Sequence, residues 1–403
     1  MSKVKITGHA SGTGILTVTA PDTDVNRTIT LPDATDTLIG AATTDALTTR
    51  INANGGRKNL IINGAMNVYQ RGTADVVDST ATFSLDRWYC YLKGGALATV
   101  TQDTDVPAGQ GFGFSHKIDI TTGDALGTST DITRLSYDIE AQDLQHLEYG
   151  HANAKTMTLS FWIKSTITGT YIAAFYQKDS AGDRILSKSY TVDSADTWEK
   201  KTITIEGDAS GTINNDNGAG MMLNFGLGAG SNWTSGTLAT SWQNYDATDQ
   251  FTGQVNAVSS ASNNIYITGV QLEVGSVATD FEYRSFGEEL ALCQRYYEKS
   301  YAQATTPGTT TDNGRHAFFF NTVNNGYVGG FIKHIVTKRA TPTITIYAPG
   351  DGTSGEGSFY EFGTSTTNTT LGADQINDTG FSVYKTGVNC DAMALHYTSI
   401  SEL

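Results

Sequence analysis

Short segments in which apolar and polar residues alternate dominate the chain. They are rich in threonine, isoleucine, valine and aromatic residues, as in residues 156–163 (TMTLSFWI). A period of two places alternate side chains on opposite faces of a strand, so the pattern predicts half-buried antiparallel strands. Clusters of Gly, Asn, Asp and Ser, for example at 214–220 and 228–231, predict turns between them. The sequence therefore predicts a mostly β protein made of tandem antiparallel β-sandwiches.

Two segments depart from the alternation and predict helices. Residues 43–54 (TTDALTTRINAN) place Leu47 and Ile51 four residues apart on one side, and two glycines follow as a stop signal. That apolar stripe is narrow, so we expect a short coiled-coil-like junction that joins three chains, with a surface linker helix as the alternative. The second segment, 287–301, has two glutamates in its first turn and apolar residues at helical spacing.

These breaks divide the chain into parts of different kinds. At roughly 150 residues per domain, 403 residues suffice for two or three domains with real cores. We predict a small threonine-rich β segment at 1–42, a helical junction at 43–58, a large sandwich at 59–285, a connecting helix at 286–302 and a distal β unit at 303–403.

Composition excludes several classes of function. The formal net charge is −15, from 26 Lys and Arg against 41 Asp and Glu, so nucleic acid and anionic membrane surfaces should repel the chain. No apolar run approaches the ~18 residues of a membrane span, and the start has no apolar stretch typical of a signal peptide. Cys90, Cys293 and Cys390 lie far apart, which is neither a disulfide framework nor a zinc pattern and favours thiols reduced in a cytosol.

Several phrases of the sequence resemble the tail-fibre proteins of tailed bacteriophages, especially those of marine phages. They are specific as a set and together bracket residues 12–300, about three quarters of the chain. The phrases are GTGILT at 12–17 with NRTITLPDA at 26–34, NLIINGAMNVYQRGT at 59–73 with LDRW at 85–88, and ITGVQLEVGS at 267–276 with FEYR at 281–284 and GEELALCQRYY at 287–297. The distal residues resemble the family less, apart from RATPT at 339–343.

The resemblance implies a homotrimeric virion protein assembled in the bacterial cytoplasm. It implies that residues 1–42 dock on the phage tail or an adaptor protein, and that jelly-roll domains like those of carbohydrate-binding modules follow. Host surface polysaccharide or lipopolysaccharide is the implied ligand, and no cofactor is expected. The alternatives are an adaptor or head fibre that contacts no receptor, a capsule depolymerase, and a carbohydrate-binding module of a secreted bacterial enzyme.

Two groups of residues are candidates for binding a glycan. Exposed aromatic rings stack on the apolar faces of sugars, while acids and amides bond the hydroxyls. Trp233, Trp242 and Tyr245 lie in a stretch rich in Gly, Ser and Thr, where the alternative is that they plug the sandwich edge. In the distal unit, where the alternative is ordinary core aromatics with solvated acids, the candidates are Tyr347, Asp351, Glu356, Tyr360, Phe362, Asn368, Asp378 and Tyr384.

The sequence favours a protein without catalytic activity. There is no G-x-S-x-G, H-E-x-x-H or P-loop motif, and no long array of solenoid repeats typical of depolymerising spikes. A glycosidase would need two carboxylates flanking the scissile bond, for which Asp138, Glu140, Asp143 and Glu148 are available. His146 and His151 lack the helical spacing of a zinc site, so we expect no metal; a structural Ca²⁺ held by backbone carbonyls would leave no motif.

The motif residues near the start of the sandwich suggest structural roles. We expect Trp88 to pack into the sandwich and Asp86 to pair with Arg87 across a loop. Arg71 and Glu273 are a further candidate ion pair, which would tie the first strand to the last.

Overall fold

The computed structural model describes residues 57–403, apart from residues 77, 180–182 and 362–365. Three antiparallel β-sheets and a few short helices make up this part of the chain, which confirms the predicted mostly β fold with sandwich-like arrangements. The predicted segment 1–42 and the trimer contacts Leu47 and Ile51 lie outside the described residues. No helix that the structure describes is long and apolar enough to cross a bilayer.

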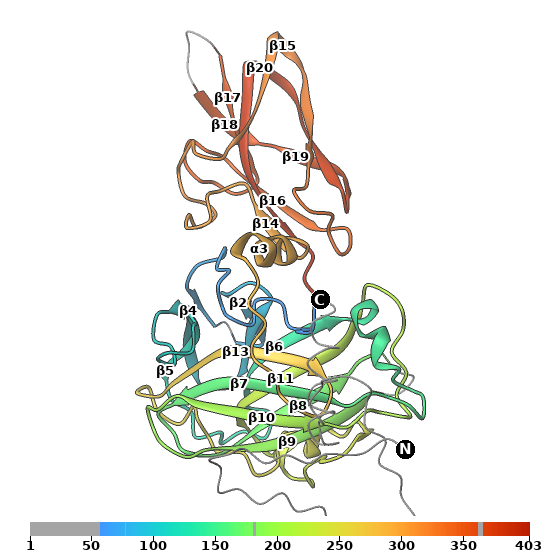
Figure 1. The fold of residues 1–403 in the computed structure, drawn as a ribbon. Coiled ribbons are helices and arrows are strands. Elements are labelled where there is room, and N and C mark those ends of the chain that lie inside the picture. The colour runs from blue at the N-terminus through green and yellow to red at the C-terminus, as the bar shows by residue number, and fades with distance from the viewer. Residues whose placement is uncertain (1–56, 77, 180–182, 362–365) are drawn as a thin grey trace, which may run out of the picture. The chain divides into compact units, whose positions relative to one another are not determined.

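Two of the sheets form a sandwich between residues 74 and 274 (Figure 1). In spatial order, the six-stranded sheet consists of β1 (Ala74–Asp75), β4 (Leu97–Asp103), β5 (Ser115–Thr122), β13 (Asn264–Val274), β7 (Met157–Ser165) and β10 (Glu199–Ile205). The seven-stranded sheet consists of β12 (Gln243–Asn244), β9 (Arg184–Val192), β8 (Gly169–Gln177), β11 (Ala219–Ala229), β6 (Ile132–Glu140), β3 (Trp88–Lys93) and β2 (Thr80–Phe83).

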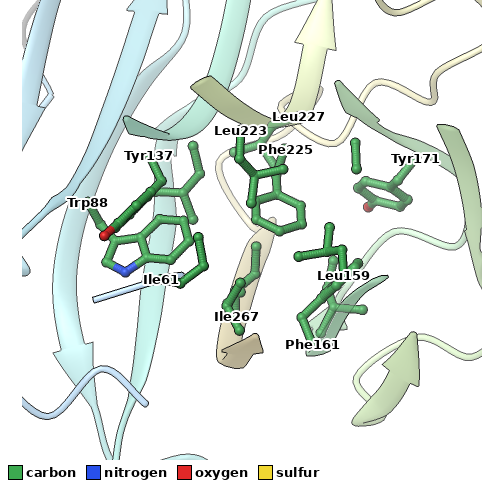
Figure 2. Close-up of a cluster of buried hydrophobic side chains, with 14 of the residues drawn as sticks. Ile61, Trp88, Tyr137, Leu159, Phe161, Tyr171, Leu223, Phe225, Leu227 and Ile267 are labelled. Carbon is green, nitrogen blue, oxygen red and sulfur yellow. The ribbon is translucent and has the colours of Figure 1, made fainter. Parts of the chain in front are cut away.

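The sandwich core is built by the alternation seen in the sequence. On β7, Leu159 and Phe161 are fully buried in the same core cluster as Phe225 of β11, and the rings of Phe161 and Phe225 lie 4.9 Å apart. Trp88 is fully buried as predicted, with its ring 4.9 Å from that of Tyr137 (Figure 2). Burying such rings is worth about 2–3 kcal/mol each, so this layer stabilises both sheets.

The third sheet is organised around one long strand, β20 (Gly380–Ile400). Figure 1 shows β20 and β15 as long ribbons lying beside each other. The other strands of this sheet are β14 (Tyr297–Lys299), β15 (His316–Lys333), β16 (Thr343–Tyr347), β17 (Glu356–Tyr360), β18 (Thr366–Thr370) and β19 (Gly372–Asn377). Its own apolar cluster includes Phe381, Val383 and Leu395, all fully buried.

The helix predicted at 287–301 is shorter than expected. Helix α3 covers Phe286–Gln294, and the Ser285 side chain caps it by accepting a hydrogen bond from the Glu288 backbone N–H at 3.3 Å. The prediction was wrong beyond Gln294, because Tyr297–Lys299 instead form β14 and pair with the end of β20. The remaining helical turns are α2 (Ser231–Thr234), η1 (Ala141–Leu147) and η2 (Ala247–Asp249).

Asparagines of the 59–73 phrase connect distant segments of the sandwich. The side chain of Asn63 bonds the Val68 backbone N–H and carbonyl, both at 2.9 Å, and the Asp86 carbonyl at 3.0 Å. The Asn59 carboxamide oxygen accepts from the Leu272 N–H at 3.0 Å, which joins the first part of the sandwich to β13. Asn63 has a positive φ of 59°, a conformation that asparagine tolerates better than most residues.

Two predicted ion pairs are wrong. Arg71 pairs with Glu402 instead of Glu273, whose carboxylate is bonded by Thr279 and Gln271. Arg87 also pairs with Glu402, while both oxygens of the Asp86 carboxylate accept from Gln70, at 2.7 and 2.8 Å. The partners lie too far apart along the sequence for spacing to reveal them.

Candidate functional site

Two of the predicted distal binding residues line one pocket. Tyr360 at the end of β17 and Asn368 on β18 border a pocket of about 440 Å³. The Arg315 guanidinium lies 5.3 Å from the centre of the Tyr360 ring and donates to its hydroxyl at 2.7 Å. Asp351 is bonded by the Thr353 backbone and by Asn368, and these hydrogen bonds lower the pKa of the Asp351 carboxyl. The structure thus brings Tyr360, Asn368 and Asp351 together.

The other predicted distal residues do not join this group. Tyr347 at the end of β16 packs edge-on against Tyr301, with ring centres 6.1 Å apart. Glu356 begins β17 and is partly buried, whereas Asp378 is exposed between β19 and β20. Tyr384 lies on β20, with its ring nearly parallel to that of Tyr327. Phe362 lies outside the described residues.

The three aromatic candidates of the sandwich have three separate environments. Trp233 packs against the small apolar cluster that covers part of the seven-stranded sheet. Trp242 packs against the main core, donates its indole N–H to the Glu206 carbonyl at 2.7 Å, and lies 5.9 Å from the ring of Tyr149. Tyr245 instead contacts a tyrosine of β8, because its ring centre lies 4.7 Å from that of Tyr176.

Tyr245 belongs to a cluster that the sequence analysis missed. Strand β6 reads ITRLSYDIE, and its apolar residues Leu135, Tyr137 and Ile139 point into the core. Residues at alternate positions therefore face outward, and cross-strand pairing places them beside outward residues of β3, β11 and β8. We call this set, on the outer face of the seven-stranded sheet, the outer-face cluster: Tyr91, Arg134, Asp138, Tyr176, Asn224 and Tyr245. The polar residues at every second position of β6 were the signal that could have revealed it.

Arg134 is the central cation of the outer-face cluster. Its guanidinium lies 5.1 Å from the centre of the Tyr91 ring, and it is paired with Tyr91 in the β3–β6 register. Burial raises the pKa values of Tyr176 and Tyr245, and the positive charge of Arg134 opposes this rise in both. One guanidinium therefore acts on rings from separate segments, and its buried Nε has no hydrogen-bond partner within the described chain.

The floor of the cluster holds further polar atoms that lack partners. Asn224 is fully buried and accepts from the Ser136 hydroxyl at 2.7 Å, but its Nδ2 has no partner among the described residues. Asp138 accepts from the Tyr89 hydroxyl at 3.1 Å through one oxygen, and its other oxygen lies 3.9 Å from the Lys178 ammonium. Burial raises the pKa of Asp138, while Lys178 and Arg87 partly offset that effect. Buried donors and acceptors of this kind need a partner from outside the chain, such as an ordered water or the hydroxyl group of a ligand.

Two of the other carboxylates available for catalysis, Glu140 and Glu148, have partners within the protein. Glu140 bonds Arg295 at 2.6 and 3.0 Å and the Tyr296 hydroxyl at 2.7 Å. Glu148 pairs with Lys155 at 3.3 Å near a pocket of about 190 Å³ that also includes His151. Within the described ranges, no group of three or more His, Cys, Asp or Glu side chains is arranged to hold a metal ion.

Comparison with known proteins finds structural likeness only. No protein-family model matches the chain, and no curated protein matches it. Among solved structures, the enzymatically active domain of tailspike protein 4 of bacteriophage CBA120 matches at a TM-score of 0.29 and 15% identity, covering 54% of this chain and 21% of the tailspike.

Carbohydrate-binding modules are also among the matches. The family 11 module of the Clostridium thermocellum cellulase Lic26A-Cel5E matches at a TM-score of 0.26 and 15% identity, covering 52% of this chain and 98% of the module. TmCBM61, solved with β-1,4-galactotriose, matches at a TM-score of 0.26 and 12% identity, covering 54% of this chain and 99% of TmCBM61. Galactotriose is a ligand of TmCBM61 in that structure.

Proposed function

We propose that this protein binds a host surface glycan as a non-catalytic, homotrimeric tail fibre of a tailed bacteriophage. The observation that carries the binding role is the outer-face cluster, where three partly exposed tyrosine rings adjoin the Arg134 guanidinium, the Asn224 amide and the Asp138 carboxylate, each with one atom that has no hydrogen-bond partner in the described chain. Aromatic faces stack on the C–H faces of sugars, and the polar atoms satisfy sugar hydroxyls. The fibre assignment rests on the resemblance of the phrases within residues 12–300 to tail-fibre proteins.

Within this proposal each part of the chain has its own role in adsorption. Residues 1–42 dock on the tail or an adaptor, and the junction at 43–58 holds three chains in register through Leu47 and Ile51. The ligand is a surface polysaccharide or lipopolysaccharide of the host. Three copies of a weak site in one fibre bind with an avidity far above that of a single contact.

Affinity electrophoresis of the purified protein through gels containing bacterial surface polysaccharides tests the binding role. We expect retention by at least one polysaccharide, and about fivefold to tenfold weaker binding for Tyr176→Ala and for Arg134→Gln. Tyr266→Ala is the matched control, because Tyr266 is a partly exposed tyrosine on β13 of the other sheet. No retention, or equal effects of Tyr176→Ala and Tyr266→Ala, would contradict the role of the outer-face cluster.

Light scattering tests the trimer. We expect about three times 43.0 kDa for the full chain, and a smaller mass for a Leu47→Asp/Ile51→Asp variant. A monomeric full chain would refute the trimeric fibre, whereas a trimer unaffected by the variant would assign trimerisation to another segment.

A reducing-end assay separates binding from depolymerisation. Asp138 is the carboxylate of the outer-face cluster, so it is the residue to test for catalysis. We expect no sugar release from the retained polysaccharide. Release that Asp138→Asn abolishes would replace the binding role with that of a depolymerase.

A further inference from the structure

Several large aromatic side chains of the third sheet are exposed to solvent, and three of them belong to one paired part of β15 and β20. Tyr327, Phe331 and Tyr384 are 65%, 54% and 38% exposed. Tyr327 and Phe331 belong to β15, and Tyr384 belongs to β20, which lies between β15 and β19 in the pairing. Exposed rings scattered singly need no explanation, but rings gathered on one face mark an interaction site.

The strand register places these three rings on the same face. Tyr384 pairs with Gly329, two residues from both Tyr327 and Phe331, so the three side chains point to the same side. The residues between them point to the other side, where Val328 and Val383 are buried in the apolar cluster of the sheet. The exposed face is therefore distinct from the face that forms the core.

Glycines of the sheet leave the space that the three rings occupy. A Cβ added to Gly329 would come within 3.2 Å of the Tyr327 ring, and one added to Gly372 within 3.0 Å of the Tyr384 ring. A Cβ at Gly380 would lie 2.4 Å from the Phe331 ring. Each ring thus covers the space that a side chain would fill, and it turns its other face to solvent.

The two tyrosine rings are also nearly parallel. Their planes differ by 12°, with centres 6.2 Å apart, and each ring lies over its own glycine. Two exposed rings that lie this close together present their apolar faces in nearly the same orientation. This arrangement suits a ligand with apolar faces of its own, such as a sugar ring.

The charged and polar groups on this face favour an uncharged ligand that carries hydroxyls. Lys333 and Asp374 point to the same side by register, so their formal charges cancel, although the whole chain carries −15. The Ser382 hydroxyl bonds the Gln375 side chain at 3.1 Å, and both lie beside the rings as hydrogen-bonding groups. A strongly charged partner would therefore meet one charge of each sign on this face.

The size of the face argues against a second copy of the chain as its occupant. Aromatic side chains contribute about 150–250 Å² each, so at the observed exposures the three rings offer roughly 300 Å². A stable protein interface needs about 800 Å² from each partner. Three rings suffice for a few sugar units, since sugar binding relies on stacking at individual rings.

We propose that Tyr327, Phe331 and Tyr384 form an aromatic platform that binds a neutral polysaccharide strand by stacking on the flat faces of its sugar rings. The inference extends the proposed glycan-binding function to a second surface, separate from the outer-face cluster. Two glycan-binding surfaces on one chain would multiply the contacts made by each fibre.

Depletion isotherms with insoluble cellulose and insoluble chitin, whose β-1,4-linked strands present flat sugar faces, test the platform. We expect the full-length protein to bind at least one of them, and a Tyr327→Ala/Phe331→Ala variant to bind roughly 10-fold to 100-fold more weakly. Tyr384→Phe should retain binding, because it keeps the ring and removes only the hydroxyl. Phe319→Ala is the matched control, because Phe319 is 74% exposed on β15 but pairs with Ala392 in the other half of β20.

The variants distinguish failure of the platform from failure of the proposed function. Equal binding by the wild type and by the Tyr327→Ala/Phe331→Ala variant would overturn the platform, as would a wild type that binds neither cellulose nor chitin. Retention on bacterial surface polysaccharide with sensitivity to Tyr176→Ala would, in either case, leave the outer-face cluster standing. A fall in oligomer mass on Tyr327→Ala/Phe331→Ala would identify the face as a contact between copies and would also overturn the proposal.

Discussion

Neutralising Glu298 should selectively destabilise the third sheet. Glu298 on β14 is fully buried and accepts from Lys338 at 2.6 Å, from the Tyr397 hydroxyl at 2.7 Å and from the Ile335 N–H at 3.1 Å. Burial alone raises the pKa of Glu298, but hydrogen bonds from His334, Lys338 and Tyr397 outweigh it and lower the pKa to about 2. The native state therefore holds an ionised carboxylate whose donors converge from two segments, residues 334–338 and strand β20.

Two independent arguments give the loss in free energy of unfolding expected for Glu298→Gln. Removing one partner of a buried ion pair costs about 3–5 kcal/mol, because the fully buried Lys338 ammonium loses its counter-charge. A pKa held at about 2 instead of 4.5 corresponds to about 3 kcal/mol. A Glu298→Gln/Lys338→Met double variant removes both charges and should recover most of the loss.

Hydrogen exchange is the suitable assay, because all five tryptophans lie between residues 88 and 242 and report only on the sandwich. We expect exchange in β14 and β20 to quicken by roughly 100-fold in Glu298→Gln, with β7 and β13 unchanged. Protection in the double variant should return toward that of the wild type. An effect below about 1 kcal/mol in the single variant, or a double variant less stable than the single one, would refute the reasoning.

Three further predictions concern pH, thiols and Glu402. Because the folded pKa of Glu298 is lower than its unfolded value, its stabilisation is present above pH 4.5 and is lost as pH falls toward 2. Urea unfolding should therefore show that the wild type loses stability over this range relative to Glu298→Gln/Lys338→Met. All three cysteines are buried, and burial raises the pKa of Cys90 to about 12, so a thiol reagent should modify none in the native protein and three after unfolding; rapid native labelling would contradict this. Glu402→Gln should lower the free energy of unfolding by about 3 kcal/mol, because it removes the carboxylate that pairs with the buried Arg87 and the partly buried Arg71. Glu288→Gln, which breaks the exposed pair with Arg57, should cost under about 1 kcal/mol. Similar melting curves for the two variants would count against this prediction.

The local pattern of the sequence determined the class of fold. Alternation in segments such as 156–163 predicted strands correctly because side chains of a strand alternate between faces, whatever the strand pairs with. The burial of Trp88 and the start of α3 were likewise predictable, since apolar size and helix capping act over a few residues.

Pairing between distant segments was decided by the tertiary structure alone. Helix α3 ends at Gln294 because Tyr297–Lys299 pair with the end of β20, more than 90 residues away in the sequence, and form a strand. Arg71 and Arg87 pair with Glu402 and not with Glu273 and Asp86, the partners predicted from the motifs. An ion pair depends on distance in space, and no fixed spacing in the sequence identifies it.

The candidate sites show the same division. Aromatic and polar residue types near 245 and 384 were visible in the sequence, but only strand register gathered Tyr91, Arg134 and Tyr176 on one face of a sheet. The platform likewise required a glycine on the neighbouring strand β19, Gly372, to lie beneath the ring of Tyr384. Composition determined which side chains were available. Strand pairing decided which of them lie side by side, because pairing joins residues that are far apart in the sequence.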